Sequence, residues 1–137
     1  MNVTPYVFFN GNCAEAIAYY QKVLGARVRS QAKYGDTPAK EHVPAEFHDK
    51  VIHADLEIGG SSLMMSDDCR PEAGGPGGYS LTIGADSTAE AKRMFDALAD
   101  GGTVTMEFGK TFFAEAFGSV HDRFGIRWMV IAGSHGA

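Results

Sequence analysis

The sequence predicts one α+β domain built from two similar halves, each with the element order strand, helix, strand, strand, strand. Three observations lead to this prediction. Apolar residues alternate along short strand-like segments and recur at helical spacing in two longer segments. The same order of elements occurs twice along the chain. A glycine- and proline-rich segment at residues 69–78 separates a first module at about 1–68 from a second at about 79–132.

Composition and length exclude several classes of protein. The 137 residues suit a single domain, and the formal net charge of −5 argues against a nucleic-acid-binding protein, which needs a basic face. No apolar run is long enough to cross a membrane, and the first residues lack the basic start and apolar stretch of a signal peptide. We therefore expect a cytoplasmic protein that binds neither nucleic acid nor membrane.

The first half begins with a β-branched and aromatic segment at residues 3–9, which predicts a strand. Pro5 places that strand at a sheet edge or marks its start, because proline cannot donate a ladder hydrogen bond. A helix follows, with Asn12 as its N-cap, Glu15 three residues later, and Gly25 at its end. We expect residues 35–50 to form a mobile loop. The remaining strands are expected at 26–34, 51–58 and 61–66, the last two joined by a hairpin at Gly59-Gly60.

The second half repeats this order. A strand at 79–83 precedes a helix that Ser87 caps, with Glu90 as its capping-box partner and Asp100 at its end. Strands at 103–108, 114–120 and 126–132 follow. The repeat is also visible in the residues, since Ala14-Glu15-Ala16 recurs as Ala89-Glu90-Ala91. One helix covers only one face of a four-stranded sheet, so a partner or a ligand must account for the other face.

The two cysteines do not predict a special site. Cys13 and Cys69 have no metal-ligand spacing, and a reducing cytosol disfavours a disulfide. Cys13 falls where the first helix begins, a place where a helix N-terminus lowers a thiol pKa and makes the thiol reactive. We favour the simpler interpretation that Cys13 is a small structural residue near the helix cap.

Several motifs occur in order along nearly the whole chain: Phe8-Phe9-Asn10-Gly11-Asn12-Cys13-Ala14-Glu15-Ala16, Leu24-Gly25-Ala26, His53-Ala54-Asp55-Leu56-Glu57-Ile58-Gly59-Gly60, Leu63-Met64-Met65-Ser66-Asp67 and Asp122-Arg123-Phe124-Gly125-Ile126-Arg127-Trp128-Met129. With them the chain resembles the PhnB-like branch of the glyoxalase/bleomycin-resistance, or vicinal-oxygen-chelate, superfamily. Members of this branch are often labelled demethylubiquinone methyltransferase-like. The resemblance implies paired βαβββ modules whose sheets curve around a cup, and commonly a homodimer that completes two cups.

The resemblance also implies where a metal would bind. Enzymes of the superfamily hold a divalent ion with His, Gln or Glu on four cup strands, and the matching positions here are Pro5, Met64, Tyr79 or Ser80, and Met129. Such ions prefer carboxylate or imidazole ligands, so we expect neither a metal nor another cofactor. The methyltransferase label gains no support from the glycines at 74–78, which precede a strand instead of joining a strand to a helix.

Strand alternation places an acid–base trio on one face of the strand at 51–58. The apolar residues of that strand share the face that we expect under the helix: Ile52, Ala54, Leu56 and Ile58. His53, Asp55 and Glu57 then share the other face. They either bind a polar ligand, supply a general base or hold a metal, or they form a solvent-facing polar strip.

The last strand offers a second set of candidates. Alternation makes Trp128 a core residue and turns Arg127 and Met129 towards the cup. Arg127 either clamps a carboxylate or phosphonate or pairs with Asp122 or Glu57. Met64 and Met129 are expected to line the cup with soft apolar surface. Phe112, Phe113 and Phe117 either add an aromatic wall or belong to the core or a dimer contact.

Three functional hypotheses remain open. The favoured one is a metal-free protein that binds a small molecule in the cup. The alternatives are a metal-dependent lyase, isomerase or dioxygenase with non-standard ligands, and a structural or regulatory homodimer. No residue is assigned a catalytic role. The expected ligand-binding residues are His53, Asp55, Glu57, Met64, Arg127 and Met129.

Overall fold

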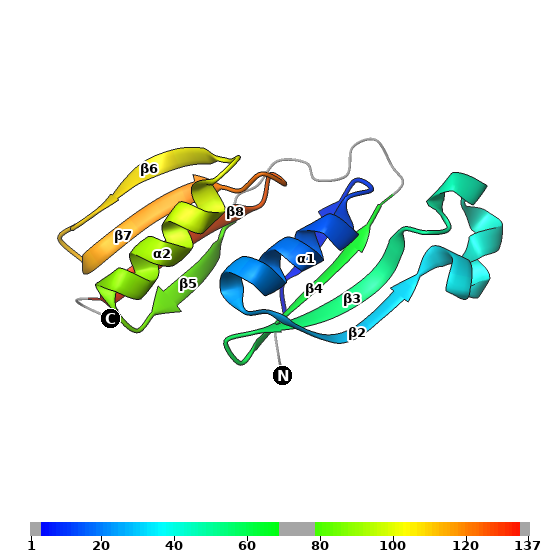
Figure 1. Ribbon diagram of the computed structural model, residues 1–137, viewed down its shortest axis with the longest axis horizontal. Coiled ribbons are helices and arrows are strands. Elements are labelled where there is room, and N and C mark those ends of the chain that lie inside the picture. The colour runs from blue at the N-terminus through cyan, green and yellow to red at the C-terminus, as the bar shows by residue number, and fades with distance from the viewer. Residues whose placement is uncertain (1–3, 69–78, 135–137) are drawn as a thin grey trace. The chain divides into compact units, whose positions relative to one another are not determined.

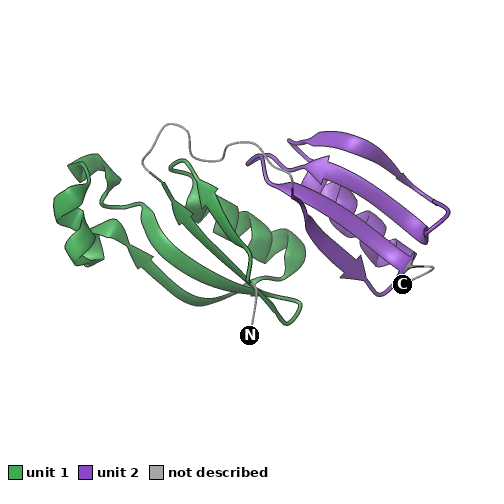
Figure 2. Cartoon of the chain, turned by 180° about the vertical axis from the view of Figure 1, so that it is seen from behind, with its two compact units in different colours: residues 1–75 green, residues 76–137 purple. Residues whose placement is uncertain are grey.

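The computed structural model describes residues 4–68 and 79–134, and the chain divides into two compact units, Met1–Gly75 and Pro76–Ala137 (Figure 2). Each unit contains one four-stranded sheet and one 12-residue helix that lies across a face of that sheet (Figure 1). The predicted α+β fold with two tandem βαβββ modules is confirmed. The predicted linker at 69–78 lies outside the described residues.

The first unit contains β1 (Tyr6–Phe9), α1 (Cys13–Leu24), β2 (Arg27–Lys33), β3 (Val51–Ile58) and β4 (Ser61–Asp67). The strand order is β1-β4-β3-β2, with β1 parallel to β4 and the other pairs antiparallel. β1 is an edge strand, as Pro5 predicts. Gly59 and Gly60, with φ of 57° and 87°, form the predicted two-residue turn between β3 and β4.

The second unit contains β5 (Leu81–Ala85), α2 (Thr88–Ala99), β6 (Thr103–Gly109), β7 (Ala114–His121) and β8 (Arg127–Ser134). Its strand order, β5-β8-β7-β6, repeats the topology of the first sheet. The fifth strand begins two residues later than predicted, because Leu81 is the first residue to pair, opposite Trp128. Tyr79, whose strand preference suggested an earlier start, is 58% exposed ahead of the strand.

The segment between β2 and β3 is not an irregular loop. It forms three short 3-10 helices, η1 (Tyr34–Asp36), η2 (Pro38–His42) and η3 (Ala45–Phe47). The Thr37 hydroxyl accepts the Ala39 N–H at 3.2 Å and so caps η2, and the ring of Tyr34 meets that of Phe47 edge-on at 5.1 Å. The sequence gives only a weak signal for these short helices, because charged residues and two prolines surround them.

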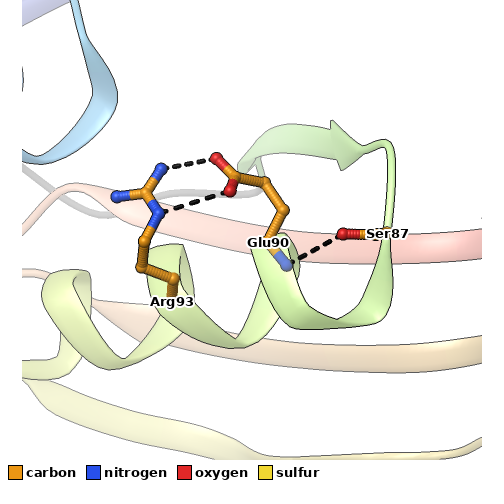
Figure 3. A network of polar contacts seen from close by, with 3 residues as sticks. All are labelled: Ser87, Glu90 and Arg93. Atoms are coloured by element: carbon orange, nitrogen blue, oxygen red, sulfur yellow. Dashed lines mark hydrogen bonds and ion pairs between the residues drawn. The ribbon is translucent and has the colours of Figure 1, made fainter.

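The two helices begin with different caps. In α2 the Ser87 hydroxyl accepts the Glu90 N–H at 3.1 Å, as predicted, while the Glu90 carboxylate pairs with Arg93 (Figure 3). That hydrogen-bonded pair lowers the pKa of Glu90. In α1 Asn12 occupies the predicted N-cap position, but its side chain makes no cap hydrogen bond.

The core of each unit lies between its helix and the covered face of its sheet. In the first unit α1 buries Ile17 and Tyr20, and the sheet buries Leu56 and Met65. Each such side chain contributes about 1.5–3 kcal/mol through burial. In the second unit a Cβ at Gly118 would lie 2.6 Å from the ring of Phe95, so only glycine lets α2 approach β7 this closely. None of the helices within 4–68 and 79–134 is long and apolar enough to span a bilayer.

Candidate functional site

The first sheet has one face that α1 does not cover, which we call the open face of the first sheet. The apolar face of β3 is confirmed for Ala54 and Leu56, which are fully buried, whereas Ile52 and Ile58 are half-buried. The cross-strand register places on this open face the following residues of β1, β3 and β4: Tyr6, Phe8, His53, Asp55, Glu57, Ser62, Met64 and Ser66. On β2, Ser30 stands opposite Asp55 and Ala32 opposite His53. Four of the six predicted ligand-binding residues are therefore brought together on one face of one sheet.

A hydrogen bond between Tyr6 and His53 crosses this face. The Tyr6 hydroxyl lies 3.0 Å from His53 Nδ1, although β1 and β3 are not neighbours and β4 runs between them. The Tyr6 ring is 5.7 Å from the imidazole and 5.0 Å from the ring of Phe8. Ser66 of β4 pairs with Phe8 and is only 5% exposed. The hydrogen bond orients the imidazole through Nδ1, so Nε2 is the ring nitrogen that can meet a ligand.

Asp55 is the exceptional group of this face. Its Oδ1 is the one buried side-chain nitrogen or oxygen atom without a hydrogen-bond partner in residues 4–68 and 79–134. No hydrogen bond or ion pair reaches either oxygen of Asp55 within those residues. Buried polar groups are almost always hydrogen-bonded, and leaving one unpaired costs about 1–3 kcal/mol. Any partner of this oxygen therefore comes from outside the described residues.

Glu57 differs from Asp55 in having a counter-charge. Its carboxylate lies 3.6 Å from the guanidinium of Arg29, which also donates to the Ser62 hydroxyl. Within the first unit the ion-pair partner of Glu57 is therefore Arg29, which lies on the adjacent strand β2. Side chains of both ions are about a third or more exposed, so this pair contributes little to stability.

Arg127 and Met129 lie on the corresponding open face of the second sheet. Trp128 and Val130 are buried on the face that α2 covers, while Arg127 and Met129 alternate with them and are half-buried. Met129 pairs with Thr82 on one side and Ser119 on the other. Arg127 makes no hydrogen bond or ion pair with any residue that the structure describes.

The alternative partner for Arg127, Asp122, serves the turn before β8. The Asp122 carboxylate accepts the N–H groups of Phe124 at 2.9 Å and Ile126 at 3.1 Å, and the Trp128 indole N–H at 2.9 Å. Asp122 is 3% exposed. It therefore fixes the turn and the indole, and Arg127 is left to meet another group.

The three phenylalanines form a short aromatic series. The rings of Phe112 and Phe113, and those of Phe113 and Phe117, meet edge-on at 5.1 Å. Phe117 is 9% exposed, whereas Phe112 is 94% exposed at the loop between β6 and β7. Only the inner end of the series is core, so the outer end presents an apolar ring to solvent.

Asp67 is the polar residue that the sequence interpretation missed. Its carboxylate accepts the N–H groups of Gly11 and Cys13 at 2.9 Å each, and that of Val51 at 3.0 Å. A residue 54 positions away thus caps α1 in place of Asn12. The only signal in the sequence was an acid at the end of an apolar strand, where alternation directs it inwards.

Cys13 is buried and inert. It is 0% exposed, and burial together with the Asp67 carboxylate raises the pKa of the Cys13 thiol to about 12. These effects outweigh the helix N-terminus, which alone would lower that pKa. The structural interpretation of Cys13 is therefore supported over a nucleophilic role.

The donor groups at the superfamily's metal positions do not fit a divalent ion. Pro5 offers no side-chain donor, and its carbonyl accepts the Met64 N–H at 3.0 Å. Met64 and Met129 offer thioethers, which hard and borderline cations bind poorly. Tyr79 and Ser80 precede β5 and are exposed. Residues 4–68 and 79–134 also contain no group of three or more His, Cys, Asp or Glu side chains placed to hold an ion.

Comparison with solved structures identifies the fold. The chain superposes on a glyoxalase/bleomycin-resistance protein/dioxygenase domain from Frankia sp. EAN1pec with a TM-score of 0.64 at 13% identity, over 100% of this chain and 95% of that one. The fold is therefore that of the glyoxalase/bleomycin-resistance/dioxygenase superfamily. Within it, the model of the family described as 3-demethylubiquinone-9 3-methyltransferase matches residues 1–131, and the chain belongs to this PhnB-like family.

Individual relatives agree with this assignment. Protein YjdN of Escherichia coli K12 is 39% identical over an alignment that covers 95% of this chain and 94% of YjdN. The crystal structure of PA1353 from Pseudomonas aeruginosa has a TM-score of 0.86 at 43% identity, over 97% of this chain and 98% of that one. A putative 3-demethylubiquinone-9 3-methyltransferase, PhnB protein, from Bacillus cereus has a TM-score of 0.81 at 24% identity, over 97% and 100% of the two chains.

Proposed function

We propose that this chain is a cytoplasmic, metal-free small-molecule-binding protein, and that the open face of each sheet supplies ligand-binding residues. The observation that carries the proposal is the open face of the first sheet, which combines the Tyr6–His53 hydrogen bond with the unpartnered carboxylate of Asp55. The proposed ligand-binding residues are His53, Asp55, Glu57, Met64, Arg127 and Met129.

The burial of these side chains favours a binding surface over a solvent-facing polar strip. His53, Asp55, Glu57 and Met64 are all half-buried although no helix covers them. A polar strip on a solvated sheet face would be freely hydrated and would have no reason to leave an atom buried and unpaired. A surface of this kind, apolar in parts with a few convergent polar groups, is typical of small-molecule sites.

Binding without metal follows from the donor set. A bound ion would need carboxylate or imidazole ligands at positions that carry proline and thioether side chains. Elemental analysis of purified protein is expected to give substoichiometric divalent metal. Stoichiometric zinc, nickel, iron or manganese that survives dialysis would instead support the metal-dependent lyase, isomerase or dioxygenase.

The helix N-termini support a binding protein over a nucleotide-dependent methyltransferase. The turn into α1 contains one glycine, Gly11, and the Asp67 carboxylate already occupies its N–H group together with that of Cys13. The turn into α2 is capped by Ser87. A nucleotide-type cofactor site needs such N–H groups for its own anionic group. At both helix starts a side chain of the protein already accepts some of these groups.

We also propose a homodimer. Its support is Phe112, which exposes 94% of its surface and sits at the outer end of the aromatic series. Sedimentation velocity is expected to give twice the mass of the 14.7 kDa chain, and Phe112→Ser to shift the protein towards one chain. The mass of one chain at every concentration would contradict the dimer.

Chemical-shift mapping with a fragment library tests the binding function. Compounds that bind are expected to perturb the amides of residues 53–57 and 64 or those of 127 and 129. Amides in α1 and α2 should move little, because both helices lie on the covered faces. Shifts spread over the helices, or no saturable shift with any fragment, would exclude this binding surface.

A further inference from the structure

We propose that Asp55 anchors a protonated nitrogen, so that the preferred ligands are small molecules joining an ammonium or amidinium group to an aromatic ring. The inference rests on the proposed function, because it names the chemistry of the ligand at the open face of the first sheet. It is carried by the one buried, unpartnered side-chain atom in residues 4–68 and 79–134, Asp55 Oδ1.

The charge of this face favours a cation at Asp55. A carboxylate that is partly removed from water attracts a cation more strongly than an exposed one does, and it does so most when no other group competes. Among the described residues, the cation that contacts an acid of this face is Arg29, and it lies beside Glu57 and Ser62. No described cation contacts Asp55, so this carboxylate is available to an incoming cation.

The strand register sets the length and shape of the ligand. Tyr6, Met64 and Asp55 stand in one cross-strand row, with Tyr6 opposite Met64 and Met64 opposite Asp55. Adjacent strands are about 4.8 Å apart, so the Cα atoms of Tyr6 and Asp55 are about 10 Å apart with Met64 between them. The Tyr6 side chain reaches across this distance, because its hydroxyl lies 3.0 Å from His53 on the strand of Asp55. A ligand that reaches both must lie across Met64 and carry its two recognised groups at its ends.

Aromatic side chains receive the other end of the ligand. Tyr6 is 39% exposed and Phe8 is 44% exposed, and their rings are 5.0 Å apart. These rings and the thioether of Met64 form an apolar floor that suits an aromatic ring, since a methionine sulfur packs well against aromatic edges. The same ring faces also attract a cation. An anionic ligand would meet Asp55 without compensation.

The test uses three matched probes: 2-phenylethylammonium, the neutral 2-phenylethanol and the anionic phenylacetate. Binding to the full-length chain is followed through the amides of Asp55 and Met64 and the Met64 methyl group. The variant is Asp55→Asn, which keeps the shape and removes the charge. The matched control is Glu15→Gln, which changes net charge equally but lies exposed in the first turn of α1.

We expect 2-phenylethylammonium to bind at least about tenfold more tightly than 2-phenylethanol, and phenylacetate to bind most weakly. Asp55→Asn should remove most of the preference for the cation, and Glu15→Gln should leave it unchanged. If the cation and the alcohol bind equally and both shift Met64, the proposed charge preference is wrong, but the proposed binding function is retained. An equal effect of both variants would show that overall acidity is the cause, which also overturns the anchor.

Two further outcomes would overturn the proposal in other ways. If magnesium or zinc alone shifts the amides at 53–55 and competes with the organic probe, the carboxylate is part of an ion site. If none of the three probes moves Asp55 or Met64, whereas fragments move other open-face residues, Asp55 is no anchor. If Asp55→Asn unfolds the chain, Asp55→Ser provides the same comparison, since it also removes the charge.

Discussion

The carboxylates of Asp67 and Asp55 lie on neighbouring strands of one sheet but on opposite faces, and their hydrogen bonding is opposite. Asp67 on β4 lies on the covered face and accepts three backbone N–H groups at 2.9–3.0 Å. Asp55 on β3 lies on the open face and has a buried oxygen without a partner. One carboxylate therefore stabilises the fold, and the other is kept at a cost that a bound ligand would relieve.

Replacing Asp67 with Asn should destabilise the protein by about 2–4 kcal/mol, because three hydrogen bonds to a charged acceptor hold α1, β3 and β4 together. Urea unfolding followed by circular dichroism measures the change. Glu15→Asn, at an exposed position in α1, serves as the control and should have little effect. A loss below about 0.5 kcal/mol for Asp67→Asn would show that the cap is dispensable.

Replacing Asp55 with Asn should raise the free energy of unfolding of the ligand-free protein by about 1 kcal/mol, because a neutral amide is cheaper to desolvate than a carboxylate. The same urea titration gives the value, and Asp67→Asn provides the contrast. Destabilisation comparable to that of Asp67→Asn would mean that Asp55 has a structural partner and is not held ready for a ligand.

The Cys13 thiol should make stability fall in alkali. Its pKa is about 12 in the folded chain against an ordinary value of 9.0, so below pH 9 the thiol is neutral in both states. Between pH 9 and 12 only the unfolded state ionises, and stability falls by up to about 1.4 kcal/mol per pH unit. Comparison with Cys13→Ala in a Cys69→Ser background isolates this contribution. Identical alkaline profiles for the two proteins would refute the buried thiol.

Gly118→Ala should cost about 2–3 kcal/mol, because the new Cβ would lie 2.6 Å from the Phe95 ring and α2 would have to move away from β7. Gly84→Ala on β5 is the matched control, since no heavy atom lies within 4 Å of a Cβ there. Thermal unfolding of both variants decides the matter. Equal melting temperatures would show that the close approach of α2 is not required.

Removing the Tyr6 hydroxyl should release the His53 ring. In Tyr6→Phe the ring stays on the open face while the 3.0 Å hydrogen bond to Nδ1 is lost, which costs about 1 kcal/mol. Imidazole ¹⁵N shifts are expected to change towards the tautomer mixture of a solvated histidine. Phe8→Leu, which leaves the hydroxyl in place, should not change them. Unchanged shifts in Tyr6→Phe would show that the Tyr6 hydroxyl does not orient the His53 ring.

Patterns of short range predicted most of the fold. Alternation in β3 correctly separated Ala54 and Leu56 from His53 and Asp55, and Ser87 correctly marked the start of α2. Both predictions depend on residues only a few positions apart, and the sequence shows such patterns directly. The hairpin at Gly59-Gly60 belongs to the same class, because its φ angles require glycine.

Interactions between distant residues were not predictable in the same way. Asp67 replaces Asn12 as the cap of α1 because the parallel pairing of β1 with β4 brings the end of β4 to the helix start. Tyr6 reaches His53 because β1 and β3 flank the same strand, β4, an order that the sequence does not state. Both hydrogen bonds depend on which strands are neighbours, and the patterns in the sequence do not show this. The strand order affects the candidate site more than the core.

A crystal structure of the chain with bound 2-phenylethylammonium tests the central claim most directly. We expect the ligand on the open face of the first sheet, with its nitrogen within hydrogen-bonding distance of the Asp55 carboxylate and its ring on Met64 beside Tyr6. A ligand seated away from that face, or an Asp55 carboxylate already bound to a protein side chain, would contradict the claim.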